Sequence, residues 1–192
     1  MIKVFDNILD ENEKDKIEGF LRDPAFPWYL ANNDGNYTTD KSVFESNKDE
    51  NTVETTLLGH DFYRDNVRVS ENYLVSDIIL DRFLQYTGHE FKAKVRSKAN
   101  LQLASSMNSD VYTTPHFDLN FDHYVLLYYP VSSTGNTVIF KEKRNENLKN
   151  YNVLEEVQPK KGRYLLFDGN HYHAVRHVTE NNLRLTVNIG FI

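Results

Sequence analysis

Strict alternation of polar and apolar side chains over residues 183–189 is the feature that most constrains the fold. In the run Leu-Arg-Leu-Thr-Val-Asn-Ile, the polar residues Arg184, Thr186 and Asn188 share one face of an extended strand, and four aliphatic residues share the other. The polar face has two interpretations that the pattern leaves open: it meets solvent, or it lines a barrel interior whose apolar side is covered by helices. In the second case Arg184 is a fixed guanidinium inside a cleft, well suited to a bidentate carboxylate.

Other segments in the second half of the chain also have strand patterns. Residues 93–104 alternate, and Asn100 lies on their polar face, which makes it a candidate cavity residue. Further strands are predicted at 123–131, 136–140 and 163–167. The many short strands indicate a two-sheet jelly roll.

Helical signals lie in the first half, after a short strand expected at residues 2–5. Asp10 begins a helix, and Glu13, three positions on, completes a capping box. A second helix is predicted at 70–86, with Ser70 as its N-cap and Gly88 at its C-terminal side. The polar stretch 31–52 is interpreted as a loop, for which closure as a lid and plain disorder are equally open.

The order of these elements predicts one domain over residues 1–192. We expect residues 1–90 to be mostly helical support and 91–192 to form the jelly-roll core. Two helices followed by a run of strands are typical of an α+β, mainly β fold, with helices supporting one face of an antiparallel sheet.

Composition restricts the chemistry of any site and the classes of partner. The chain has no cysteine, so a metal must be bound by His, Asp or Glu. A net charge of −6 with no basic block argues against a nucleic-acid partner. No signal peptide and no membrane-spanning apolar run are recognised, so we expect a soluble cytoplasmic protein without a membrane partner. The sequence does not indicate the oligomeric state.

The triplet His116-Phe117-Asp118 and the distal His173 form a candidate metal site. In a strand, His116 and Asp118 project to the same face and converge on one ion, while Phe117 points into the opposite packing layer. Two imidazoles and one carboxylate occupy one face of an octahedral Fe(II) and leave three positions open. His171 rivals His173, because it shares that face if the strand continues.

Together, these residues resemble the Fe(II)/2-oxoglutarate-dependent oxygenases, especially their prolyl-4-hydroxylase-like branch. The family pattern is an HxD pair, a distal histidine and an Arg or Lys on the next strand. Here His173 follows Asp118 by 55 residues and Arg184 follows His173 by 11. Residues 162–175 are similar to the family's "G-R-x-x-x-F … H-x-V" stretch, and residues 128–140 to its "Y-L-N … G-G-E-T-x-F" stretch, with departures at Pro130-Val131 and Asn136. The resemblance covers about half of the chain.

The resemblance implies a double-stranded β-helix that binds Fe(II) through His116, Asp118 and His173. The cosubstrate 2-oxoglutarate would chelate the iron and pair its C5 carboxylate with Arg184, and Tyr129 matches a tyrosine that helps to bind that carboxylate in some members. Dioxygen would take the last position. The implied reaction hydroxylates an unactivated C–H bond of a peptide residue or small metabolite and releases succinate and CO2. No catalytic residue beyond the metal centre is predicted.

Three further residues are candidates for contact with the cosubstrate: Thr186, Asn100 and Tyr112. Tyr112 shares the face of His116 on a continuous strand, but Pro115 makes that strand irregular, and a place in the core is equally open. Two other functions stay open as well. One is a cupin-like metalloenzyme without 2-oxoglutarate, and the other is a non-catalytic jelly-roll binding protein.

Overall fold

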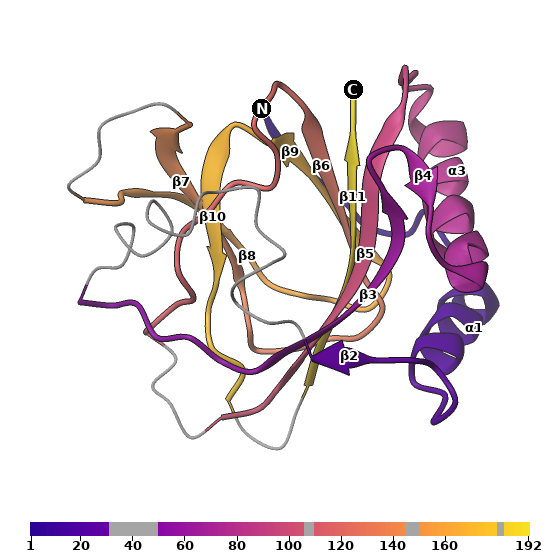
Figure 1. Ribbon diagram of the computed structural model, residues 1–192, viewed down its shortest axis with the longest axis horizontal. Helices are drawn as coiled ribbons and strands as arrows, with labels where there is room; N and C mark the ends of the chain where they lie inside the picture. Colours follow the sequence, from indigo (N-terminus) through magenta and orange to yellow (C-terminus); the bar gives the residue numbers. More distant parts are fainter. Residues whose placement is uncertain (31–49, 106–109, 145–149, 180–182) are drawn as a thin grey trace.

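The computed structural model has two antiparallel sheets that face each other, with the helices on the outer side of the larger sheet (Figure 1). It describes residues 1–30, 50–105, 110–144, 150–179 and 183–192. The helices are α1 (Glu11–Leu21), the short 3-10 helix η1 (Glu71–Tyr73) and α3 (Leu74–Thr87). The strands are β1 (Ile2–Phe5), β2 (Tyr29–Leu30), β3 (Leu57–Arg64), β4 (Val67–Arg68), β5 (Lys94–Leu103), β6 (Tyr124–Tyr129), β7 (Thr137–Lys143), β8 (Val153–Val157), β9 (Arg163–Asp168), β10 (His171–Val175) and β11 (Leu183–Phe191).

The larger sheet has eight strands in the order β1-β9-β6-β11-β5-β3-β2, with β4 paired to β3, and the smaller sheet has the order β10-β7-β8. Strands β5 and β11 pair over nine registered positions at the centre of the larger sheet, so their side chains are fixed relative to one another. The expected mainly β, two-sheet fold with two supporting helices is confirmed.

The helix ends form where the sequence predicted them. Asp10 accepts from the backbone N–H of Glu13, and the Glu13 side chain accepts from the backbone N–H of Asp10, which completes the capping box of α1. Ser70 caps η1, which leads directly into α3. Helix α3 ends at Gly88, whose φ of 68° is a left-handed conformation that glycine adopts without strain.

Alternation along the strands of the larger sheet produces two different layers. Leu185, Val187 and Ile189 of β11 face the helices and join the main core there. Between the two sheets, a second apolar cluster occupies one part of the space. Its members come from β6, β7, β8 and β9: Val125, Leu127, Tyr129, Ile139, Val157, Leu165 and Phe167. The rest of the space between the sheets is polar.

The first half of the chain contributes more strand than the sequence analysis expected. Strands β1 to β4 all come from residues 1–90, and β3 lies beside β5 in the larger sheet. Strand β3 was not predicted, because its pattern is short and is interrupted by Gly59 and charged residues. Most of the stretch 31–52, interpreted as a loop or lid, lies outside the described residues.

Tyr128, a residue of the main core, has a buried hydroxyl without a partner among the described residues. Its side chain is fully buried. By contrast, the Oη of neighbouring Tyr164 donates to the carbonyl of Ile79 at 3.3 Å. An unsatisfied buried hydroxyl costs about 1–3 kcal/mol. We therefore expect Tyr128→Phe to raise the melting temperature by about 2–4 °C, and Tyr164→Phe to lower it. Thermal unfolding monitored by circular dichroism tests both, and equal losses in the two variants would contradict the prediction.

Among the described helices, none combines the length and the apolar character that crossing a bilayer requires.

Candidate metal centre

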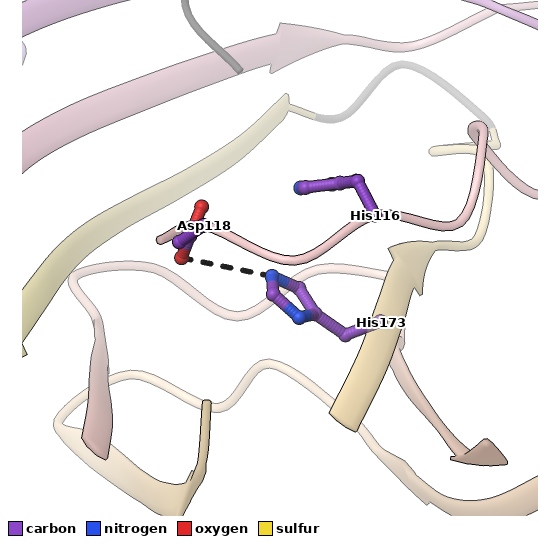
Figure 2. A group of neighbouring side chains, drawn as sticks. All are labelled: His116, Asp118 and His173. Carbon is purple, nitrogen blue, oxygen red and sulfur yellow. Dashed lines mark ion pairs between the residues drawn. The ribbon is translucent and has the colours of Figure 1, made fainter. Parts of the chain in front are cut away.

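His116, Asp118 and His173 meet between the two sheets, at the polar end of the space (Figure 2). One ligand atom of each lies within 4.8 Å of the others, and His173 Nε2 is 3.7 Å from Asp118 Oδ2. His116 and Asp118 come from the segment that precedes β6, and His173 comes from β10 in the smaller sheet. The three side chains therefore come from segments far apart in sequence.

Backbone pairing places the two histidines next to each other. The N–H of His116 donates to the carbonyl of His173 at 3.0 Å, and the N–H of His173 donates back at 2.8 Å. The pairing of β10 with β7 shifts register between His171 and His173. Because of this irregularity, His171 does not face the centre, and its Nδ1 lies 2.7 Å from the carbonyl of Phe140 instead. His173 is the histidine that the structure brings to His116 and Asp118.

Hydrogen bonds orient both imidazoles for metal binding. Nδ1 of His116 lies 2.9 Å from the carbonyl of Thr114, and Nδ1 of His173 lies 3.2 Å from the carbonyl of His171. A carbonyl accepts only, so each Nδ1 carries the proton and each Nε2 has a free lone pair. Burial lowers the pKa of His116, and burial with the charge of His116 lowers the pKa of His173 to about 4. Both rings are neutral ligands near pH 7.

The carboxylate of Asp118 is fixed in its charged form. Arg96 Nη1 donates to Oδ1 at 3.1 Å, and Asn188 Nδ2 donates to Oδ2 at 2.9 Å. Burial acts to raise the pKa of the Asp118 carboxyl, but the charges of Arg96 and the two histidines and the Asn188 hydrogen bond outweigh it and hold the pKa well below its usual range. Arg96 therefore contacts a candidate ligand.

The donor set fits a divalent metal that accepts nitrogen and oxygen ligands. Metal–ligand bonds of about 2.1 Å place neighbouring donors about 3 Å apart, so donor atoms that now lie within 4.8 Å of one another need to close by up to about 2 Å around an ion. Two neutral imidazoles and one carboxylate on one side leave the opposite positions open for other ligands. That arrangement is suited to Fe(II) chemistry in which substrates bind directly to the metal.

A cavity extends from the three residues along the two central strands. The polar face of β11 lines this cavity, so the barrel-interior interpretation of residues 183–189 is the correct one. The matching face of β5 lines it too. The lining residues from these two strands are Arg96, Lys98, Asn100, Gln102, Arg184, Thr186 and Asn188.

Arg184 lies in this cavity as a buried cation without an anion. Its side chain is 4% exposed, and it donates to the carbonyl of Gly135 at 2.9 Å, to Thr137 Oγ1 at 2.8 Å and to Gln102 Oε1 at 3.4 Å. All three acceptors are neutral, and no carboxylate of the described residues forms an ion pair with Arg184. Burial lowers the pKa of the guanidinium, which nevertheless stays charged. A buried charge of this kind favours an anionic ligand.

Tyr129 contacts the same group of side chains, although it is not among the residues that line the cavity. Its hydroxyl lies 2.7 Å from Thr137 Oγ1, and Arg184 Cζ lies 5.8 Å from its ring centroid. Burial raises the pKa of Tyr129, so the phenol is neutral and able to donate a hydrogen bond. Arg184, Thr137 and Tyr129 thus form one cluster of donors, which we call the guanidinium pocket.

The three further residues predicted to contact the cosubstrate do not all lie at the cavity. Thr186 and Asn100 line the cavity. Tyr112 does not: its ring packs at 5.4 Å from that of Phe140, in an apolar cluster on the outer side of the smaller sheet. The expected continuous strand does not form, because the segment makes only isolated bridges on either side of Pro115. The prediction of a cosubstrate contact for Tyr112 therefore lacks support, and the core interpretation fits the structure.

Sequence reasoning missed several residues of the site. Thr137 was placed on a strand but not recognised as a partner of Arg184. Glu54, whose carboxylate accepts from the backbone N–H of Thr114 at 2.7 Å, lines the cavity from a segment without a motif. Lys98 was seen only as one polar residue of an alternating strand. No pattern in the sequence distinguishes these residues from surface positions.

Comparison with known proteins identifies the fold. No protein-family model matches the sequence, and no curated protein matches it either. Solved structures do match. A 2OG-Fe(II) oxygenase family oxidoreductase from Burkholderia pseudomallei is 14% identical, with 99% of this chain and 84% of that chain covered and a TM-score of 0.63. The epimerase SnoN from nogalamycin biosynthesis, described as non-heme and alpha ketoglutarate dependent, is 10% identical, with 100% and 78% covered and a TM-score of 0.65.

A prolyl hydroxylase from Trichoplax adhaerens, solved with a hypoxia inducible factor peptide fragment, is 14% identical, with 100% of this chain and 83% of that chain covered and a TM-score of 0.57. The chain therefore has the double-stranded β-helix fold of the 2OG-Fe(II) oxygenases, prolyl hydroxylases included. It also has a His-x-Asp … His triad gathered at one point. Both features agree with the resemblance found in the sequence.

Proposed function

We propose that this protein, which shares the fold and the triad of the 2OG-Fe(II) oxygenases, is an Fe(II)- and 2-oxoglutarate-dependent dioxygenase. The observation that carries the proposal is the joint presence, in one cavity, of the three candidate ligands and the buried guanidinium of Arg184. The triad offers three donor atoms to a cation, and Arg184 is a buried cation that forms no ion pair with the described residues. Iron would supply the cation for the triad, and a dicarboxylate would supply an anion for Arg184.

The residues of the cavity would have separate roles. His116, Asp118 and His173 would hold Fe(II), and the guanidinium pocket would bind the C5 carboxylate of 2-oxoglutarate. When bound, Fe(II) supplies the chemistry that couples O2 reduction and oxidative decarboxylation of 2-oxoglutarate to succinate and CO2 with insertion of one oxygen atom into a C–H bond. The apolar cluster next to the cavity, which includes Leu127, excludes water from one side.

We propose hydroxylation of an unactivated C–H bond in a peptide residue or a small metabolite. The support is indirect. Among the structurally similar proteins, a prolyl hydroxylase was solved with a peptide and SnoN with nogalamycin RO, so the fold accommodates both classes of ligand.

Two measurements test the proposal. Anaerobic addition of 2-oxoglutarate to the Fe(II) protein should give a metal-to-ligand charge-transfer absorption band, and exposure to air should give succinate in a 2-oxoglutarate-dependent reaction. Absence of the band would favour a non-catalytic jelly roll. Metal-dependent turnover that does not require 2-oxoglutarate would favour a cupin-like enzyme. Such an enzyme does not need the buried guanidinium of Arg184 near the metal.

Asn188 should matter for iron binding although it is not a ligand. Its amide donates to Asp118 Oδ2 and restricts that carboxylate to one orientation. Loss of such an outer hydrogen bond weakens metal affinity by about 10–100-fold. We expect this loss in Asn188→Ala, measured by calorimetric titration with Mn(II) as an air-stable substitute for Fe(II).

Asn152→Ala is the matched control for this prediction. Asn152 is exposed and its amide donates to the Glu142 carboxylate at 2.8 Å, so the same substitution removes the same type of bond far from the site. Its affinity for Mn(II) should equal that of the wild type. Equal affinities in Asn188→Ala and the wild type would show that Asp118 does not need this support.

A further inference from the structure

Lys98 is a second buried cation in the cavity, and the proposed function does not use it. It lies in the middle of β5, is 3% exposed and lines the same cavity as the candidate ligands. In the register of the sheet it is opposite Asn188 of β11 and Asp61 of β3. No ion pair or hydrogen bond joins its Nζ to any of the described residues.

The neighbouring carboxylates already have other partners. The carboxylate of Asp61 pairs with Arg64, and that of Asp118 is held by Arg96 and Asn188. Burial, followed by the charge of Arg96, lowers the pKa of Lys98 to about 8. The ammonium is still mostly charged at pH 7, so a positive charge is buried that no ion pair with the described residues compensates. Such a site is costly unless an anion binds there.

Gly59 makes room for this lysine. A Cβ at position 59 would lie 2.8 Å from Cε of Lys98, so a side chain there would displace the end of the lysine from its present position. The lysine also lines a second hollow, together with residues such as Tyr29, Gly59 and Asn72. Lys98 thus lies at the boundary between the inner cavity and an outer hollow, where a ligand too long for the inner cavity would extend.

Lys98 lies at the triad end of the cavity, away from the guanidinium pocket. Its register partner Asn188 is four residues from Arg184, which corresponds to about 13 Å at 3.3 Å per residue. A five-carbon dicarboxylate bound at Arg184 and at the triad does not need a third cation at that distance.

The charges of the cavity also favour an anion. Three cationic side chains line it (Arg96, Lys98 and Arg184) against two carboxylates (Glu54 and Asp118). Fe(II) and the 2-oxoglutarate dianion would cancel each other, so one positive charge would remain in the loaded site. Arg96 is paired with Asp118, and Arg184 would be paired with the cosubstrate, so among the described cations of the cavity Lys98 would be the one that lacks a counter-ion.

We propose that Lys98 binds an anionic group of the primary substrate, a carboxylate or a phosphate, and so selects acidic substrates for oxidation at the metal. The assignment of the anion to the substrate rests on the proposed function. The existence of an anion site at Lys98 does not. A substrate whose charged group is bound by Lys98 would place a carbon away from that group at the metal centre.

Lysine NMR tests the anion site without any turnover. Protein labelled with 13C at lysine Cε is loaded with diamagnetic Zn(II) and saturated with 2-oxoglutarate, and is then titrated with sodium acetate or inorganic phosphate. The Lys98 signal, identified by its absence in Lys98→Met, should shift saturably with one of the two anions, and its pKa should rise by about one unit or more. Acetate as the effective anion would indicate a carboxylate substrate, and phosphate a phosphorylated one.

Variants separate the site from general charge effects. Gly59→Ala keeps the lysine but displaces it, so the anion affinity measured at Lys98 should fall at least tenfold. Lys92→Met removes an exposed lysine of the same segment and should leave the Lys98 titration unchanged. If the chemical shift of the Lys98 signal changes with neither anion, the proposal is overturned. A signal that responds to 2-oxoglutarate alone would overturn it too, since Lys98 would then belong to the cosubstrate site.

The two proposals can fail independently. An anion-dependent Lys98 signal in a protein that forms no charge-transfer band with Fe(II) and 2-oxoglutarate would refute the proposed function and leave the anion site in place. A normal band with an unresponsive Lys98 signal would refute only the inference about the substrate.

Discussion

Replacing His173 with alanine is expected to abolish retention of Fe(II). The loss of one of three protein ligands should lower metal affinity by on the order of 10³-fold, since removal of a hydrogen bond to a ligand already costs about 10–100-fold. His173 and His116 pair through their backbones, and the ring of His173 contacts the Phe167 ring at 5.2 Å. The alanine variant keeps the backbone pairing, so the fold should survive. Iron content after anaerobic loading and gel filtration measures the effect.

His171→Ala is the control, because the two histidines are similarly buried and belong to the same strand. His171 bonds to the carbonyl of Phe140 and does not line the cavity. Its alanine variant should retain wild-type iron even where its melting temperature is lower. Iron loss in His171→Ala with retention in His173→Ala would reverse the ligand assignment.

Arg184→Met is expected to weaken binding of 2-oxoglutarate by on the order of 10²–10³-fold without loss of iron. Truncation of one partner of a buried charge pair costs about 2–5 kcal/mol, and each 1.4 kcal/mol corresponds to a factor of about ten. The free protein should not be destabilised by the loss of a charge, because Arg184 has no carboxylate partner among the described residues, and an apolar side chain of similar length replaces it.

Thermal unfolding with and without 2-oxoglutarate distinguishes a loss of cosubstrate binding from a change in the stability of the free protein. In the wild type, 2-oxoglutarate should raise the melting temperature of the metal-loaded protein, because a ligand that binds only the folded state stabilises it. In Arg184→Met the rise should disappear over the same concentration range. Arg163→Met, which breaks a surface ion pair with Asp6, should keep the full rise. A full rise in Arg184→Met would remove this residue from the cosubstrate site.

Strands β5 and β11 were predictable because the alternation that specifies them can be seen within a few neighbouring residues. Residues 183–189 alternate without exception, and a period of two specifies both an extended backbone and two different faces. The capping box at Asp10 and the left-handed Gly88 are also local signals, and both helices begin and end close to the predicted positions. Strand β3 was missed because its local pattern is weak and pairing with β5 decides its conformation.

The candidate ligands illustrate the limit of such reasoning. The spacing of His116 and Asp118 indicated a shared ion, yet the two residues do not lie in a regular strand. They meet His173 through an isolated backbone bridge. The choice between His171 and His173 depended on resemblance to a family, whereas in the structure a register shift between the two makes it.

By itself, the sequence determined which residue types were available for a metal, which strands alternate and which chain segments form helices, because these depend on neighbours within a few positions. Only the tertiary structure decided which side chains share a cavity. It turned the polar faces of β5 and β11 inward, placed Thr137 against Arg184, moved Tyr112 into an apolar cluster and buried Lys98 where no described residue pairs with it. The physical reason is that burial and pairing of charges depend on contacts between strands distant in sequence, which no local pattern encodes.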